Sequence, residues 1–226
     1  SLSPDGNQLA FTLWVGTDNA PLLFTGSPEG DDPTLLTNMV ALAPAWSPDG
    51  EKIAFRSDRD SESGSAVYLL DLAAPAEPPR MVIQDRLRSD LAPSWSLDSA
   101  HLFLHATLDG ATQVVSVDVV SGAVQLILAR TAHDPRVSPD GLRIAMWMPA
   151  FEGYSLSIGS IGEPPRPLTQ THMNPAPYSW SPDGALIAFA STEDGRSVVR
   201  LLDTVTGSTS IAFYSPSRVS GIAWRP

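Results

Sequence analysis

The sequence predicts an all-β chain built from repeated units of four antiparallel strands. A Ser-Pro-Asp-Gly turn recurs, an alternating apolar run follows each copy, and no segment shows a helical periodicity of useful length. The serines that open the turn, one of them in a degenerate copy, are Ser3, Ser47, Ser96, Ser138 and Ser181. They lie 44, 49, 42 and 43 residues apart. A turn-and-strand pattern with that period is typical of a β-propeller, in which each repeat forms one blade.

Each copy of the turn is expected to form a tight corner between two strands. Proline fixes φ at the second position of a β-turn, aspartate binds the backbone of the turn, and glycine adopts the positive φ that follows. A tryptophan ends the strand before the turn in most repeats, at Trp46, Trp95, Trp180 and Trp224. These tryptophan segments are the expected innermost strands.

The second strand of each repeat carries the apolar run after the turn, at 9–11, 53–55, 102–104, 144–146 and 187–189. Most of these runs alternate large, small and large residues, which predicts a strand packed on both faces. A bulky residue on one face and alanine on the other would let adjacent blades interlock. Phe103 replaces the small residue in the third repeat, so we expect an irregular blade there.

Two further strands complete each repeat. The third strands are expected at 22–25, 67–71, 114–118, 156–159 and 198–203. The fourth strands are expected at 35–37, 81–83, 126–128, 167–169 and 211–213. Four strands in each period match one blade of a propeller.

The repeats predict a single β-propeller domain over residues 1–226. Its repeats cover about 1–44, 45–93, 94–135, 136–178 and 179–222, and a closing or sixth-blade strand extends to 226. Residues 219–224 would supply the innermost strand of the first blade, whose own copy is reduced to Ser1 and Leu2, and so close a ring of five blades. The alternative is a fragment of a six-bladed parent, in which Trp224 begins another blade.

Composition bounds the possible partners. The net charge is −11, from 25 acidic and 14 basic residues, so the surface repels nucleic-acid phosphates and no nucleic-acid binding is expected. Cysteine is absent, which excludes disulfides, thiolate metal sites and cysteine nucleophiles. No apolar run approaches the length of a membrane span, so we expect no membrane insertion. The oligomeric state is left open.

The order Trp-Ser-Pro-Asp-Gly-x-x-Ile-Ala-Phe, then a strand ending in Asp, then Leu-Thr, resembles the TolB-type (WD40-like) β-propeller repeat over nearly the whole chain. The resemblance implies a noncatalytic bacterial scaffold that binds a protein or peptide partner, and it favours a periplasmic or other extracytoplasmic location. It also implies six blades as the usual number. Prolyl oligopeptidase-like peptidases share the repeat, so the alternative is an accessory propeller domain of a larger enzyme or sensor. A ring that binds a small molecule in its channel is a third possibility.

The residues that could carry chemistry favour a noncatalytic protein without cofactor or metal. Ser160 directly follows Gly159, so the segment fails the Gly-x-Ser-x-Gly pattern of a serine nucleophile. His101 and His105 share one face of a strand at a spacing that could bind a metal, but Lys52 and Arg56 occupy the equivalent positions, which suggests an ordinary polar blade surface. The acidic segment 58–62 lacks the glycine and glutamate of a calcium loop and is interpreted as a solvated hairpin.

The segments that lead into the innermost strands are the candidate partner-binding surface. In a propeller these loops gather around one mouth of the channel, and here they are polar and differ from one another, as a binding surface on a repetitive scaffold should. The candidate residues are Arg88, Asp90, His133, Asp134, His172, Asn174 and Arg218. The alternative is that these loops only form a solvated rim.

Overall fold

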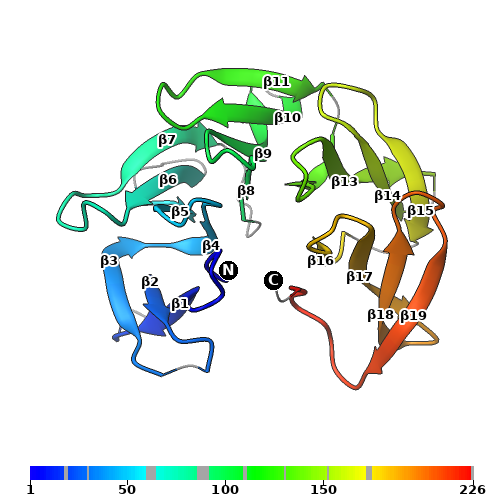
Figure 1. Ribbon diagram of the computed structural model, residues 1–226, viewed down its shortest axis with the longest axis horizontal. Helices are drawn as coiled ribbons and strands as arrows, with labels where there is room; N and C mark the ends of the chain where they lie inside the picture. The colour runs from blue at the N-terminus through cyan, green and yellow to red at the C-terminus, as the bar shows by residue number, and fades with distance from the viewer. Residues whose placement is uncertain are drawn as a thin grey trace. The chain divides into compact units, whose positions relative to one another are not determined.

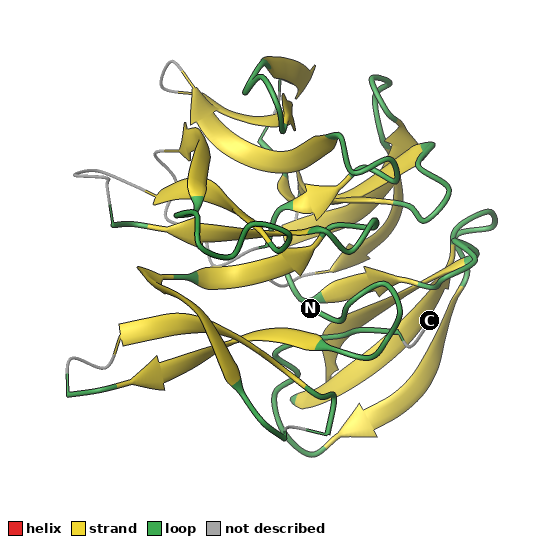
Figure 2. Cartoon of the chain, turned by 60° about the vertical axis from the view of Figure 1, so that its left-hand side comes forward, coloured by secondary structure: helices red, strands yellow, loops and turns green. Residues whose placement is uncertain are grey.

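The computed structural model describes residues 1–17, 20–29, 31–59, 65–85, 92–108, 111–129, 131–151, 153–171 and 175–224. These residues form strands and turns (Figure 2). No helix long and apolar enough to cross a membrane occurs among them. The all-β prediction is confirmed. The chain divides into two compact units, Ser1–Arg130 and Thr131–Pro226.

The first unit contains three antiparallel sheets (Figure 1). The first sheet consists of β1 (Leu9–Val15), β2 (Ala20–Gly26) and β3 (Thr34–Val40). The second consists of β4 (Leu42–Trp46), β5 (Lys52–Ser57), β6 (Ser65–Asp71) and β7 (Arg80–Asp85). The third consists of β8 (Ser94–Trp95), β9 (His101–Leu108), β10 (Ala111–Asp118) and β11 (Val124–Leu128).

The second unit contains two antiparallel sheets of four strands. The fourth sheet consists of β12 (His133–Val137), β13 (Arg143–Ala150), β14 (Gly153–Ser160) and β15 (Arg166–Thr171). The fifth consists of β16 (Tyr178–Trp180), β17 (Leu186–Glu193), β18 (Arg196–Asp203) and β19 (Thr209–Ser215). In all five sheets the strands neighbour one another in sequence order, which is the topology of a propeller blade.

The first sheet has three strands, whereas each of the other four has four. Its expected innermost strand is reduced to one bridge between Leu2 and Leu9. The predicted reduction of the first repeat to Ser1 and Leu2 therefore matches the structure. The closed ring and the single domain over 1–226 stay predictions.

The recurring turn forms the same hydrogen bonds in all five copies. In the second copy the Ser47 hydroxyl donates to the carboxylate of Asp49 at 2.5 Å and accepts from the Lys52 amide at 2.9 Å. The fourth residue has a positive φ in each copy: Gly6, Gly50, Ser99, Gly141 and Gly184. The degenerate copy thus keeps the geometry, although Ser99 stands where the others have glycine. The predicted turn is confirmed.

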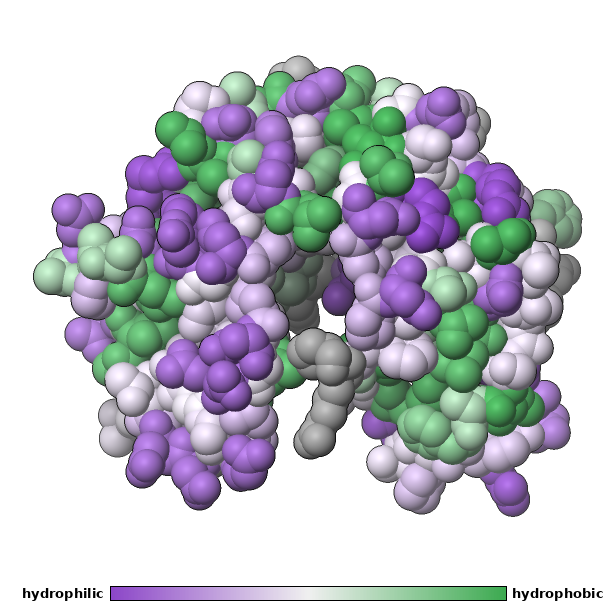
Figure 3. Space-filling model, in the orientation of Figure 1, coloured by the Kyte–Doolittle hydropathy of each residue, from purple (hydrophilic) through white to green (hydrophobic). Residues whose placement is uncertain are grey.

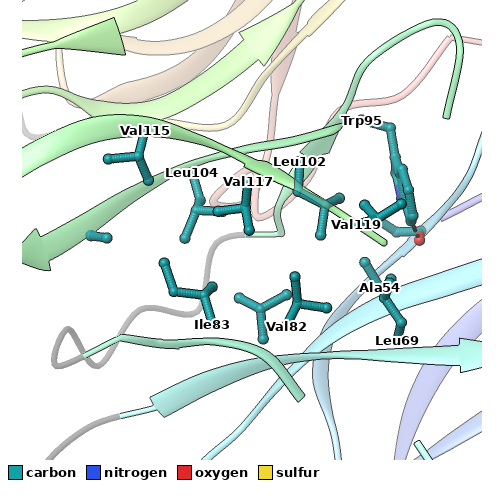
Figure 4. Packing of buried hydrophobic residues seen from close by; sticks show 13 residues of the cluster. Ala54, Leu69, Val82, Ile83, Trp95, Leu102, Leu104, Val115, Val117 and Val119 are labelled. Carbon is teal, nitrogen blue, oxygen red and sulfur yellow. Dashed lines mark hydrogen bonds between the residues drawn. The ribbon is translucent and has the colours of Figure 1, made fainter. Parts of the chain in front are cut away.

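The alternating runs build the core between neighbouring sheets within each unit. Ile53 and Phe55 belong to a cluster with residues of the first sheet, while Ala54 on the opposite face belongs to a cluster with the third. In that second cluster Leu102 and Leu104 face Ala54 and the side chains of β7 (Figure 4). Bulky and small residues on opposite faces therefore let the sheets interlock, as predicted.

Indole groups tie neighbouring innermost strands together. The Nε1 of Trp95 donates to the carbonyl of Ala45 at 3.1 Å, and that of Trp180 donates to the carbonyl of Arg136 at 3.1 Å. Trp224 makes the equivalent bond to Ser179. Trp46 differs, because its Nε1 is buried and has no hydrogen-bond partner in the described part of the chain.

One expectation about the strand surfaces is wrong. His105 and Arg56 were expected on a polar blade surface, but they are 5% and 1% exposed. His101 is partly exposed and lies 3.9 Å from the carboxylate of Asp118 on the neighbouring strand. These strands are central in their sheets, so neighbouring sheets cover even their polar side chains.

Candidate binding surface

Strand order gives each sheet two edges of different composition. Here an edge means the side of the sheet at which the strands end and turn, and not an outermost strand. Because consecutive strands are antiparallel, the Ser-Pro-Asp-Gly turns and the turns between third and fourth strands lie at one such edge, which we call the turn edge. The turns between second and third strands, and the connections to the next innermost strand, lie at the opposite edge. We call this the crossover edge. The predicted partner-binding residues that the structure describes, His133, Asp134 and Arg218, belong to crossover-edge segments.

Carboxylates at the turn edge of the second unit bind the backbone of their own turns. The Ser181 hydroxyl donates to Asp183 at 2.6 Å and the Ala185 amide at 3.0 Å, and these bonds lower the pKa of the Asp183 carboxyl. The backbone amides of Thr206 and Val205 donate to the carboxylate of Asp203 and lower its pKa in the same way. The recurring acids are therefore part of the turns.

Arginines at the turn edge are also held in place. Arg143 donates to the Thr204 hydroxyl at 3.1 Å, to the Gly184 carbonyl at 3.0 Å and to the carboxylate of Asp140 at 3.1 Å. Arg166 donates to the carbonyl of Thr204 at 3.2 Å. Both guanidinium groups thus connect segments of the turn edge to one another.

One residue of the crossover segment at the start of β12, Asp134, points its side chain into the protein interior. The Asp134 side chain is buried, its φ is 50°, and its carboxylate accepts two bonds from Arg136 Nε at 3.0 and 3.1 Å. Burial raises the pKa of the Asp134 carboxyl despite the nearby Arg136. The buried Tyr178 hydroxyl donates to the carbonyls of Asp134 and, at 2.7 Å, Ala145. This network fixes the segment and keeps the Asp134 carboxylate away from solvent.

His133, the neighbour of Asp134, is only partly buried. Its ring packs edge-on against Tyr154, with the ring centroids 5.4 Å apart. Burial lowers the pKa of His133, so the neutral imidazole is favoured at neutral pH. Of this predicted pair, His133 is thus the residue with an accessible side chain.

A cleft of about 490 Å³ lies at the crossover edge of the fifth sheet. The turn between β17 and β18 forms one side, and the end of β19 with the segment after it forms the other. Its lining residues are Gly195, Arg196, Ser197, Tyr214, Ser215, Pro216, Ser217 and Arg218. Both arginines are exposed, and neither side chain has a hydrogen bond or ion pair with any residue that the structure describes. Arg218 is one of the predicted residues.

Exposed aromatic residues also lie at the crossover edge. Phe151 follows β13 and is fully exposed, and Tyr214 in β19 is 53% exposed. In the first unit Trp14, near the end of β1, is 60% exposed. Hydrophilic and hydrophobic residues are interspersed on the molecular face drawn in Figure 3. Tyr214 directly follows Phe213, which is also exposed.

The structure describes three of the seven predicted site residues. His133 and Arg218 are accessible and Asp134 is buried, while Arg88, Asp90, His172 and Asn174 lie outside the described residues. The partner-binding set stays a prediction.

Sequence reasoning missed Arg196, Tyr214 and Phe151, because it considered only the connections between repeats. The turns between second and third strands share the same edge, and the apolar Phe151 in such a turn was the available signal.

No group of three or more residues that could hold a metal ion occurs in the described ranges. Residues 60–62 of the acidic segment 58–62, which is predicted to form a solvated hairpin, fall outside them. The turn between β17 and β18 also contains acidic residues, and it is tight, since Asp194 and Gly195 both have positive φ.

Comparison with known proteins identifies the repeat. A family model described as the TolB beta propeller domain matches residues 1–226. The structure of TolB from Acinetobacter baumannii superposes with a TM-score of 0.80 at 20% identity, over 96% of this chain and 54% of that one. A TolB structure from Agrobacterium tumefaciens gives 0.77 at 21% identity, over 95% of this chain and 79% of that one.

Enzyme chains contain the same fold. A Mycobacterium tuberculosis puromycin-hydrolyzing peptidase superposes with a TM-score of 0.65 at 19% identity, over 93% of this chain and 37% of that one. At these identities the structural likeness shows the fold alone. The family match over the full length shows more: the chain belongs to the TolB beta propeller domain family.

Proposed function

We propose that this chain is a noncatalytic β-propeller module that binds a protein or peptide partner through its crossover edge. The observation that carries the proposal is the contrast between the two edges of the second unit. Turn-edge arginines and aspartates are bound within the fold, whereas Arg196, Arg218 and Phe151 at the crossover edge are exposed. Exposed side chains that stabilise nothing internal are available to a partner.

The residue types support the same proposal. Binding energy at protein interfaces concentrates in tryptophan, tyrosine and arginine side chains. Tyr214 and the two arginines of the cleft belong to these types. The noncatalytic part of the proposal is supported by the turn acids, such as Asp183, whose lowered pKa suits a structural carboxylate better than a general acid.

A crosslinking experiment tests the binding edge directly. A photo-reactive amino acid would replace Phe151, Tyr214 or Arg218 one at a time, in the native protein in its source cells. Matched controls carry it at the exposed turn-edge residues Leu142 and Val205. We expect discrete protein adducts from the crossover edge and none from the controls. Adducts of equal yield from both edges, or from the controls alone, would overturn the proposal.

The residues predicted from sequence give a second test. Combined alanine substitution of Arg88, Asp90, His133 and His172 should abolish binding of the crosslinked partner without lowering the melting temperature. Unchanged binding would show that these residues are not part of the surface.

A second candidate function is an accessory propeller domain of a larger enzyme. It is supported by the peptidase of Mycobacterium tuberculosis, in which the matching region occupies 37% of the chain. The intact mass of the native polypeptide separates the two. A mass near 24.1 kDa favours an independent binding protein, and a much larger mass places the reaction in another part of the polypeptide.

A further inference from the structure

The cleft of the fifth sheet contains an uncompensated pair of positive charges. Arg196 opens β18, and Arg218 follows the end of β19. The second unit has six described arginines, and the guanidinium groups of four of them, Arg136, Arg143, Arg166 and Arg200, form hydrogen bonds or ion pairs. Arg196 and Arg218 are the remaining two, and both line the cleft. The unpaired guanidinium groups of this unit thus face one space.

Two acids adjoin the cleft at the turn between β17 and β18, Glu193 and Asp194, and neither has an ion pair with the arginines of the cleft among the described residues. The carboxylate of Glu193 binds Arg200 Nη2 at 3.1 Å and accepts a bond from the Tyr214 hydroxyl at 3.3 Å. The chain as a whole carries a net charge of −11. Two free arginines in an acidic protein therefore create a local site for an anion, and guanidinium groups bind carboxylates through two parallel hydrogen bonds.

The strand that leads into the cleft offers an adjoining surface. β19 is the outermost strand of its sheet, and its first six residues are exposed. Ile211 and Phe213 are 41% and 55% exposed, and the strand contains no charged residue. An outermost strand presents unpaired backbone groups to which an extended peptide can add as a further strand.

We propose that the cleft binds a carboxylate of an extended acidic segment of a partner protein, and that this segment lies along β19. The inference rests on the proposed function and specifies the chemistry of the partner. The arginines supply the charge complementarity, and the apolar side chains of β19 contact the remainder of the segment.

Selection from a display library of random dodecapeptides tests the inference without a known partner. The library contains no phosphate, so enrichment of acidic sequences reports carboxylate binding. The wild-type chain is compared with Arg196→Gln/Arg218→Gln. The matched control is Leu142→Asp/Val205→Asp, which lowers the net charge by the same two units at exposed turn-edge positions.

We expect peptides selected by the wild-type chain to contain Asp or Glu, to bind the arginine variant about tenfold more weakly, and to bind the control unchanged. Failure to enrich any peptide, enrichment without acids, or equal binding by the arginine variant would overturn the inference. Equal loss in the variant and the control would also overturn it, because the effect would then reflect overall charge.

The two experiments distinguish a failure of this inference from a failure of the proposed function. Peptides that ignore the arginines but are displaced by the crosslinked partner would leave the binding edge in place and remove only the carboxylate site. Absence of crosslinks at the crossover edge would remove both.

Discussion

The two edges of the fifth sheet use similar residues in different ways. At the turn edge, Ser181, Asp183 and Gly184 form a closed set of hydrogen bonds that recurs in every repeat. At the crossover edge, Arg196 and Arg218 line a cleft, and neither side chain has a partner among the residues that the structure describes. The difference indicates that side chains repeated in every blade stabilise the fold. Polar side chains that occur in one blade and have no internal partner indicate the surface available for binding. Pairs of substitutions, one at each edge, can test this division.

The largest expected contrast comes from Ser181→Ala and Ser217→Ala. The buried Ser181 hydroxyl accepts from the Leu186 amide at 2.9 Å and donates to Asp183 at 2.6 Å. Its loss leaves that amide without a partner and should lower the free energy of unfolding by about 2 kcal/mol. Ser217 is exposed at the crossover edge, so its loss should change stability by less than about 0.5 kcal/mol. Urea unfolding measures both, and equal effects would contradict the division.

A smaller contrast is expected between Gly184→Ala and Gly195→Ala. Both glycines have positive φ, 68° and 75°, so alanine should cost about 1 kcal/mol at either position. A methyl group on Gly184 would also lie 2.9 Å from Arg143 Nη2, whereas one on Gly195 has no neighbouring atom within 4 Å. Displacing Arg143 from the Gly184 carbonyl should add about 1 kcal/mol. Equal melting temperatures for the two variants would show that Arg143 contributes little.

A contrast of similar size should separate two tryptophans in the first unit. Trp95→Phe removes the bond to the Ala45 carbonyl and should cost about 1 kcal/mol beyond the lost packing. Trp46→Phe removes an indole nitrogen that has no partner among the described residues, so we expect a loss of packing only. Chemical denaturation of both variants gives the difference. A larger loss of stability for Trp46→Phe than for Trp95→Phe would contradict this expectation and indicate that the Trp46 indole nitrogen forms a hydrogen bond in solution.

The parts of the fold that could be predicted from sequence are those whose interactions are local. The turn was predictable because Ser47, Asp49 and Lys52 contact one another within six residues. Whether an arginine side chain is free to bind a partner protein was not predictable, because this depends on residues far away in the sequence. Arg143 binds Thr204, 61 residues away, and nothing near Arg196 in sequence indicates that it has no such partner.

Asp134 is the opposite case, a residue predicted to be exposed that distant partners bury. It was predicted as a surface residue because its segment is polar. Tyr178, 44 residues further along, binds its carbonyl and helps to enclose the segment. Polarity in the sequence therefore indicated a connection between strands but not which of its side chains face solvent.

The pH dependence of stability should distinguish the two kinds of carboxylate by sign. The folded pKa of Asp183 is below its ordinary value near 3.8, so its contribution is present above that pH and is lost as the pH falls through the folded pKa. The folded pKa of Asp134 is raised, so its contribution is largest below the ordinary value and is lost as the pH rises through the folded pKa.

Asp183→Asn should therefore reduce the loss of stability between about pH 7 and about pH 3, and Asp134→Asn should increase it. Urea unfolding at several pH values in this range measures the change in slope for each variant. Changes of the same sign would mean that Arg136, rather than burial, determines the ionisation of Asp134, because an ion pair would lower the pKa of Asp134 as hydrogen bonds lower that of Asp183. The crossover segment would then be held by that ion pair as the turns are held by their aspartates.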